Sequence, residues 1–202
     1  PACEPLFVFN GTGSNIVALQ LMVRPFHSII CAETAHIYVD ECGSPVKNTG
    51  AQIRPVLTPD GKLTPELIRP YLHGFGDQHH SQPGAIYLSQ CTELGTVYTP
   101  GELKALTSLA HEHGMYVHMD GARIANACAY LKTSLKEITA DCGIDVLSFG
   151  GTKNGLMMGE CVVIFNEELK ASAAFVRKQS AQLASKMRYL SCQFTAYLTD
   201  HL

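Results

Sequence analysis

Two clusters of residues combine types and spacing that suit the binding of a small anionic ligand. The first, GTGSN at residues 11–15, stands between an expected strand and an expected helix. Glycines there let successive backbone N–H groups point at one anion, and Thr12, Ser14 and the helix start add further donors. A phosphate fits this place, although a plain strand-to-helix turn capped by Ser14 explains the same residues equally well. The dinucleotide fingerprint GxGxxG is incomplete, because Ile16 stands at its third glycine.

The second cluster, HMDGAR at residues 118–123, places an acid at the end of an expected parallel strand. Open α/β sheets bind their ligands beyond the carboxyl ends of their strands, which is where Asp120 falls. Gly121 lets the chain turn, and Arg123 follows at the same rim. The alternative is a helix cap at Asp120 beside a solvated Arg123.

A lysine in SFGGTKNG, residues 148–155, directly follows another buried strand. Lysines in turns are usually solvated, but one helical crossover separates this strand from the strand that ends at Asp120. A right-handed crossover puts both strand ends at one edge of the sheet, so Lys153, Asp120 and the glycine cluster can face one pocket. Those groups match the needs of pyridoxal phosphate: a phosphate site, an amine for its aldehyde, and an acid that keeps its ring nitrogen protonated.

The elements that must position these residues alternate between short apolar strands and amphipathic helices. This alternation predicts an α/β fold with a mostly parallel sheet covered by helices on both faces. Strands are expected at 6–9, 28–32, 52–57, 85–90, 115–119, 145–149 and 160–165. Helices are expected at 15–23, 64–72, 99–113, 122–131, 134–140 and from 167 to the end.

The composition of the chain indicates which kinds of partner it can bind and in which compartment it works. The formal net charge of −3 offers no basic field for nucleic acid or an anionic membrane, and no apolar run approaches the length of a membrane span. The eight cysteines are scattered and form no C-x-x-C pair, which favours a reducing cytoplasm and disfavours zinc. Charged residues make up only 16%, which suggests that a partner covers some of the surface. From the residues at its two ends, we expect the chain to be a piece of a longer protein.

The sequence also resembles the threonine aldolase and β-eliminating lyase family of fold-type-I pyridoxal-phosphate enzymes. The resemblance covers nearly all 202 residues through FNGTGSN (9–15), AETAHI (32–37), SQCTELGTVYTPGEL (89–103), HGMYVHMDGARIANA (113–127) and SFGGTKNG (148–155). Within the family the chain looks most like the bacterial low-specificity L-threonine aldolases. The implied reaction is cleavage of L-threonine or L-allo-threonine to glycine and an aldehyde, in the cytoplasm.

The resemblance also implies site roles. Lys153 would carry the cofactor as a Schiff base, and Asp120 would pair with the pyridine nitrogen. Gly11 and Thr12 would hold the phosphate. Arg123 would bind the substrate carboxylate. His36, otherwise interpretable as a packing histidine, would stack on the cofactor ring and serve, alone or through a water, as the base.

Some family features are expected to be shared or absent. Members that carry a second active-site histidine place it where this chain reads QCTEL at residues 90–94, so that role is missing here. The family also implies a homodimer or homotetramer with shared sites, in which Arg188 would reach a neighbouring subunit's phosphate. Residues 1–166 would form the cofactor-binding domain, and 167–202 would lead toward a small domain.

Two other interpretations remain open from the residues. One keeps the cofactor but changes the reaction to β-elimination on another amino acid or to transamination. The other is a phosphate-binding α/β module without covalent chemistry, for which Lys153 would be dispensable. A metal site on His118 and Asp120 is disfavoured because Asp120 has a better-supported task.

Overall fold

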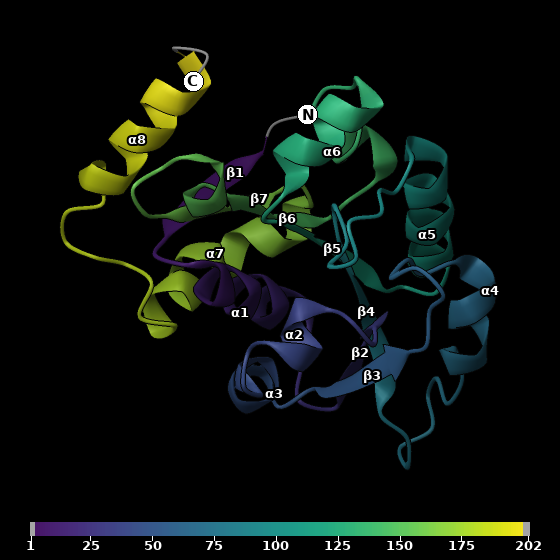
Figure 1. Ribbon diagram of the computed structural model, residues 1–202. Helices are drawn as coiled ribbons and strands as arrows, with labels where there is room; N and C mark the ends of the chain where they lie inside the picture. Colours follow the sequence, from purple (N-terminus) through teal and green to yellow (C-terminus); the bar gives the residue numbers. More distant parts are fainter. Residues whose placement is uncertain (1–2, 200–202) are drawn as a thin grey trace.

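The computed structural model describes residues 3–199 and is built on one seven-stranded sheet in the order β1-β7-β6-β5-β4-β2-β3 (Figure 1). Strands β3, β2, β4, β5 and β6 run parallel, while β7 is antiparallel to both β6 and β1. The strands are β1 (Glu4–Val8), β2 (His27–Ala32), β3 (Gln52–Val56), β4 (Gln82–Ser89), β5 (Tyr116–Gly121), β6 (Val146–Gly150) and β7 (Glu160–Ile164). The mostly parallel α/β sheet predicted from the sequence is therefore confirmed.

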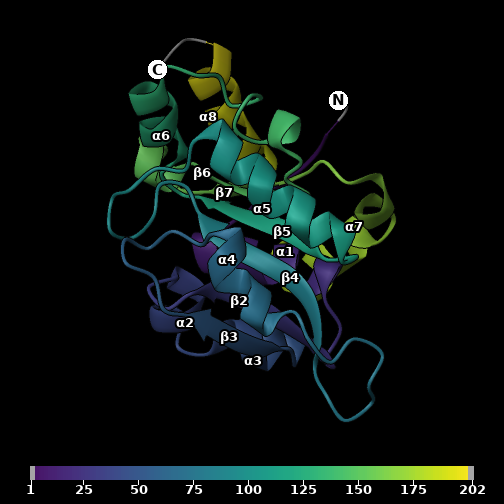
Figure 2. The same cartoon turned by 90° about the vertical axis from the view of Figure 1, so that its right-hand side faces the viewer.

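Helices cover both faces of the sheet, as Figure 2 shows with α4 and α5 in front and α1 behind. Helix α1 packs against α3 and α7 on one face, and α5 packs on β5 on the other. The α-helices are α1 (Gly11–Met22), α2 (His36–Val39), α3 (Ser44–Thr49), α4 (Pro65–Ile68), α5 (Pro100–Glu112), α6 (Ile124–Leu131), α7 (Glu167–Gln179) and α8 (Arg188–Thr199). Short 3₁₀ helices span Arg69–Tyr71, Ala140–Cys142 and Thr152–Asn154.

The alternation of side chains along β5 divides its residues between the two faces. Val117 and Met119 are fully buried in the core on the α5 side. His118 and Asp120 point to the other face, toward α1. His118 and Asp120 therefore share one side of the strand.

One predicted helix is wrong. Residues 135–139 form turns, and only the 3₁₀ helix Ala140–Cys142 follows them. The Glu137 carboxylate accepts hydrogen bonds from the backbone and hydroxyl of Ser134 and from the Thr133 hydroxyl. Side chains of this kind offer the backbone an alternative to helical hydrogen bonding.

Other helices differ in extent. The helix expected at 64–72 is α4 plus a 3₁₀ turn, because Pro70 has no N–H for the next helical bond. The helical stretch after residue 167 is two helices, α7 and α8, and Ala181 between them has a left-handed backbone (φ 58°). The short helices α2 and α3 lie in a region where no helix is expected.

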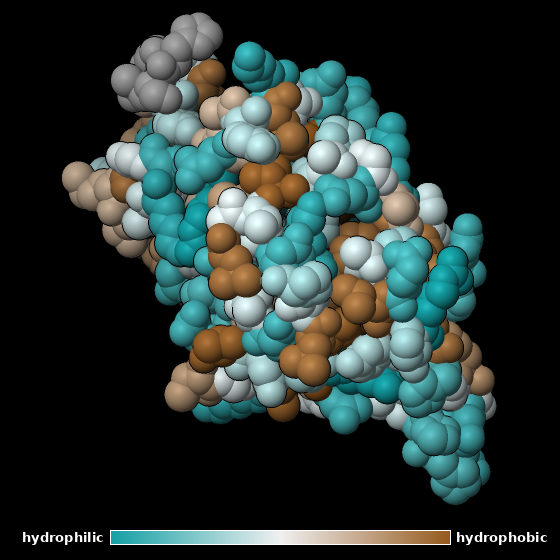
Figure 3. All heavy atoms as spheres, turned by 45° about the vertical axis from the view of Figure 1, so that its right-hand side comes forward, coloured by the Kyte–Doolittle hydropathy of each residue, from teal (hydrophilic) through white to brown (hydrophobic). Residues whose placement is uncertain are grey.

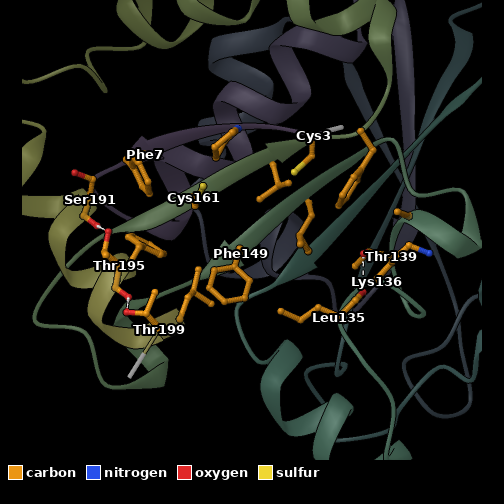
Figure 4. Close-up of a pocket in the computed structure, with 17 residues that line it drawn as sticks. Cys3, Phe7, Leu135, Lys136, Thr139, Phe149, Cys161, Ser191, Thr195 and Thr199 are labelled. Atoms are coloured by element: carbon orange, nitrogen blue, oxygen red, sulfur yellow. Dashed lines mark hydrogen bonds between the residues drawn. The ribbon is translucent and has the colours of Figure 1, made fainter. Parts of the chain in front are cut away.

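An apolar groove of about 610 Å³ lies beside α8, on the sheet face opposite α1 (Figure 4). Phe7, Phe149 and Cys161 line its floor, and Leu135 stands at its far wall. The floor side chains belong to the core on the α5 side or pack against it, so this groove is separate from the side chains around Asp120.

The described residues contain no helix that is long and apolar enough to cross a membrane. Within residues 3–199, His, Cys, Asp and Glu side chains form no group of three or more suited to a metal ion. Residues 1–2 and 200–202, to which the expectation of a piece of a longer protein refers, lie outside the described part of the chain.

Candidate functional site

The carboxyl ends of three parallel strands bring the predicted site residues to one edge of the sheet. Asp120 on β5 pairs in register with Ser89 on β4 and with Ser148 on β6. Strand β6 ends at Gly150, and Lys153 follows in the next turn. The predicted proximity of the Asp120 strand end and the Lys153 strand end is therefore confirmed.

The Asp120 carboxylate is almost fully buried and is held by three donors. Oδ2 accepts hydrogen bonds from the Tyr87 hydroxyl at 2.6 Å and from Asn15 Nδ2 at 3.2 Å. Oδ1 accepts from the backbone N–H of Ala122 at 2.9 Å. A buried carboxylate needs such partners, and these three fix its orientation without a cation from residues 3–199. The arrangement suits an acid that meets a positively charged N–H of a ligand.

The glycine cluster forms the first turn of α1, so the loop expected at residues 11–15 is wrong. Asn10 caps this helix, and its Oδ1 accepts from Gly13 N at 2.7 Å. This cap lets the helix begin at Gly11 despite its glycines. A Cβ added to Gly11 would meet no atom within 4 Å, so space for a ligand lies open beside the helix start. The free N–H groups of the first turn can therefore bind an anion.

The segment after α7 covers part of this helix start. The Gln182 side chain fills the position that a Cβ on Gly13 would take, and its Oε1 accepts from Phe9 N at 2.9 Å. Arg188, by contrast, is exposed, and its guanidinium lies 4.9 Å from the ring of Tyr189. The structure thus brings Gln182, and not Arg188, to the α1 start within one chain.

His36 begins α2 and is held at both its backbone and its ring. The His36 N–H donates to Glu93 Oε1 at 3.0 Å, and ring Nδ1 lies 2.8 Å from Glu41 Oε1. The hydrogen bond to Glu41 raises the pKa of His36, with further upward contributions from the charges of Glu41 and Asp120. Partial burial and the Lys153 charge oppose this rise. His36 therefore lies within the electrostatic reach of both strand-end groups.

Lys153 projects from a braced turn. Its side chain is exposed, and within residues 3–199 its amine makes no hydrogen bond or ion pair. The turn itself is held by Glu160 Oε2, which accepts from Gly151 N at 2.7 Å, and by Asn154 Nδ2, which donates to Gly150 O at 2.6 Å. A rigid backbone with a free amine suits covalent attachment to a carbonyl compound.

The two glycines before Lys153 serve close backbone packing. A Cβ on Gly150 would lie 2.6 Å from Cα and from the carbonyl oxygen of Ala122, and one on Gly151 would overlap the Gly159 carbonyl. Neither glycine could therefore be replaced by a larger residue without displacing backbone atoms. They let the β6 end approach the chain just after Asp120.

Arg123 stands at the start of α6 and lines a cavity of about 390 Å³. Glu93, Asn126 and Tyr130 line the same cavity. Among the described residues Arg123 makes no ion pair, so its guanidinium remains available for a carboxylate.

Several contacting residues escaped the sequence analysis. Asn15 and Tyr87 hold Asp120, Glu41 holds His36, and Gln182 covers the helix start. Asn15 belongs to the glycine cluster, and that was the one local signal. Glu41 lies five residues after His36, Tyr87 reaches Asp120 through the pairing of β4 with β5, and Gln182 comes from the segment after α7.

Comparisons with known proteins show the family to which the chain belongs. The family model described as beta-eliminating lyase matches residues 3–196. The low specificity L-threonine aldolase of Pseudomonas aeruginosa is 46% identical over 199 residues, which cover 98% of this chain and 58% of that protein. The chain therefore spans a little over half the length of this curated relative.

Solved structures show the same fold. The threonine aldolase of Leishmania major superposes with a TM-score of 0.92 at 34% identity, covering 100% of this chain and 59% of that one. An aspartate aminotransferase variant of Thermus thermophilus shares the fold alone, with a TM-score of 0.67 at 18% identity, covering 98% of this chain and 52% of that one. The family match over almost the whole chain and the 46% identical relative lead to one conclusion: the chain belongs to the beta-eliminating lyase family.

Proposed function

We propose that the chain is the cofactor-binding part of a pyridoxal-phosphate lyase that cleaves L-threonine and L-allo-threonine to glycine and acetaldehyde. The observation that carries this proposal is the buried Asp120 carboxylate, oriented by three donors, at the strand edge that Lys153 also occupies. The printed names of the relatives from Pseudomonas aeruginosa and Leishmania major support the choice of reaction.

The residues present fit pyridoxal phosphate. Gly11 and Thr12, with open space beside Gly11, would hold the phosphate at the positive end of α1. Asp120 would pair with the ring nitrogen, Lys153 would bind the aldehyde carbon, and His36 would lie against the ring. When bound, the cofactor supplies an aldehyde that reacts with amines and a ring that accepts electrons from Cα of an amino acid.

The chain's own residues would then position the substrate and move its protons. Arg123 would bind the substrate carboxylate and so orient the Cα–Cβ bond. Nε2 of His36, or a water that it orients, would take the β-hydroxyl proton as the bond breaks. Because the pKa of His36 is raised, this base form is populated only toward higher pH.

Assembly and location are part of the same proposal. Large apolar side chains are exposed, among them Met157 (89%), Leu57 (80%), Tyr130 (76%) and Phe175 (71%). Figure 3 shows apolar atoms gathered in patches between polar borders on one face. Such surfaces support a homodimer or homotetramer in which Arg188 reaches a neighbouring subunit's phosphate. The free cysteines among residues 3–199 support a cytoplasmic location.

The proposed division of the chain keeps residues 1–166 as the cofactor-binding domain and 167–202 as the stretch that leads toward a small domain. Helix α7 of that stretch packs against α1 and β1. The stretch thus stays attached to the cofactor-binding domain through α7.

Borohydride trapping tests the proposal. The whole protein is loaded with pyridoxal phosphate, reduced and mapped by mass spectrometry, and its products with L-threonine are measured in parallel. We expect a pyridoxyl group on Lys153 and equal amounts of glycine and acetaldehyde. Ammonia with a keto acid would indicate an eliminating lyase. A folded protein without a Lys153 adduct would overturn the cofactor assignment, and Lys104→Ala, at another exposed lysine, serves as the control for Lys153→Ala.

A further inference from the structure

Glu41 is a buried carboxylate whose one cationic partner within residues 3–199 is a histidine. Its side chain has no exposed surface. Oε1 lies 2.8 Å from His36 Nδ1 and accepts from Asn15 Nδ2 at 2.7 Å, and Oε2 lies 3.4 Å from the Ser44 hydroxyl. Burying a carboxylate is costly unless a positive charge and several donors accompany it, so the partner most able to compensate Glu41 is a protonated His36.

Asn15 connects this pair to the acid on β5. Its Nδ2 atom donates to Glu41 Oε1 at 2.7 Å and to Asp120 Oδ2 at 3.2 Å. Asn15 itself is almost fully buried. The amide thus separates two buried carboxylates that would otherwise repel each other at close range, and it holds both in fixed orientations.

From this arrangement we infer that Glu41 is a positioning residue, which accepts the Nδ1 hydrogen of His36, leaves Nε2 as the ring nitrogen free for other contacts, and stabilises the positively charged imidazole. The orientation of a histidine ring and the choice of its free nitrogen are set by the hydrogen bond at the other nitrogen. Glu41 lies five residues after His36 and reaches its ring from just beyond the end of the short helix α2.

The charges around His36 support a protonated ring. Glu41 bonds the ring directly, Glu93 accepts from the His36 backbone N–H, and Asp120 adds a more distant negative charge. Lys153 is the opposing positive charge. Three carboxylates against one amine favour the imidazolium. The pKa of His36 is raised, which also favours the protonated form.

This charge state bears on the reaction that we propose, and that part of the inference rests on the proposed function. Because the hydrogen bond to Glu41 raises the pKa of His36, this histidine would take the β-hydroxyl proton at a higher pH than an ordinary histidine would. The Glu41 carboxylate therefore sets the pH at which His36 becomes a base. The charge state of His36 itself does not depend on any reaction.

The test measures how fast His36 is carbethoxylated by diethyl pyrocarbonate between pH 5 and pH 9. The cofactor-free whole protein is used, and the modified peptide is followed by mass spectrometry, because only the neutral imidazole reacts. In the wild type we expect the rate of His36 to rise with a midpoint above that of the exposed loop residue His79. In Glu41→Gln the His36 midpoint should fall by about one pH unit or more, a tenfold change in its acidity.

Glu93→Gln is the matched control, because it removes the same charge from the backbone side of His36 and leaves the ring partner intact. A fall in the midpoint as large as that of Glu41→Gln would overturn the specific role of Glu41. An unchanged midpoint in Glu41→Gln would do the same. If Glu41→Gln does not fold, a wild-type midpoint at or below that of His79 still overturns the inference, and one above it supports a charged His36.

This readout separates the inference from the proposed function. A shifted His36 midpoint together with no Lys153 adduct would support Glu41 and remove the lyase assignment. A Lys153 adduct together with an unshifted midpoint would have the opposite meaning. With the loaded enzyme, the acidic limb of the activity profile, where activity rises with pH, should move to lower pH in Glu41→Gln.

Discussion

The hydroxyl group of Tyr87 donates a 2.6 Å hydrogen bond to Oδ2 of Asp120, across the pairing of β4 with β5. Both side chains are buried on the α1 face of the sheet. Burial and the neighbouring Asp120 charge raise the pKa of the Tyr87 phenol well above its usual range. Tyr87 therefore stays protonated over the whole working pH range and always serves as a donor to the acid.

Tyr87→Phe should loosen Asp120 without changing the shape of the core. Hydrogen bonds to charged groups contribute about 1.5–3 kcal/mol, so we expect the dissociation constant for pyridoxal phosphate to rise about 10- to 100-fold. The measurement is a spectroscopic titration of the cofactor-free whole protein. Tyr98→Phe is the matched control, because it also deletes a buried hydroxyl, one that accepts from Leu63 N at 2.7 Å. Equal cofactor affinities in the two variants would show that the Tyr87 hydroxyl does not contribute to cofactor binding through Asp120.

Gly150→Ala should displace the turn that carries Lys153. The added methyl group would lie 2.6 Å from backbone atoms of Ala122, and overpacking of this kind typically costs about 1–3 kcal/mol. We expect a lower thermal midpoint and a lower yield of the borohydride adduct on Lys153. Gly101→Ala, in the first turn of α5 with nothing within 4 Å, should change neither quantity for the worse. If Gly150→Ala had the same thermal midpoint and adduct yield as Gly101→Ala, the close approach of Gly150 to Ala122 would be unimportant for the Lys153 turn.

The fully buried ring of His118 should make the fold sensitive to acid. Burial lowers its pKa to about 4 from 6.5, against an opposing contribution from Asp120. The folded protein therefore holds the neutral ring, and the stability that this ring contributes is complete above pH 6.5 and is lost as pH falls toward 4. The loss approaches roughly 3 kcal/mol, since one pKa unit corresponds to about 1.4 kcal/mol.

His118→Gln should reduce this acid sensitivity, because an amide has no proton to gain. Thermal midpoints of the whole protein between pH 7.5 and pH 4 provide the measurement, with the exposed His113→Gln as control. The fall in midpoint with acid should be smaller in His118→Gln than in the wild type or the control. Parallel curves for all three proteins would contradict a buried neutral His118.

Arg123→Lys should weaken substrate binding more than turnover. A lysine keeps the charge but loses the two-pronged geometry that matches a carboxylate. We expect the KM for L-threonine to rise about tenfold or more, with a smaller effect on kcat. Arg69→Lys, at an exposed position in the 3₁₀ turn after α4, is the control for the same exchange elsewhere. An unchanged KM in Arg123→Lys would place carboxylate binding at another residue.

Local patterns were enough to place the strand ends. Apolar runs followed by turn residues identified β5 and β6, and the handedness of crossovers then brought Asp120 and Lys153 to one edge. The same patterns failed at residues 134–140, because the Glu137 side chain competes there for backbone N–H groups. They also missed that Asn10 lets α1 begin at Gly11.

By itself, the sequence determined the α/β architecture, the family and the strand-end groups, because these depend on residue order and periodicity. Only the tertiary structure decided which side chains surround those groups. Asn15 and Asp120 are 105 residues apart in the sequence, and they meet because helix α1 packs on strand β5. Glu41 meets His36 and Asn15 together because α2 ends beside the same helix. Such contacts depend on the packing of one element over another, which periodicity along a chain does not encode.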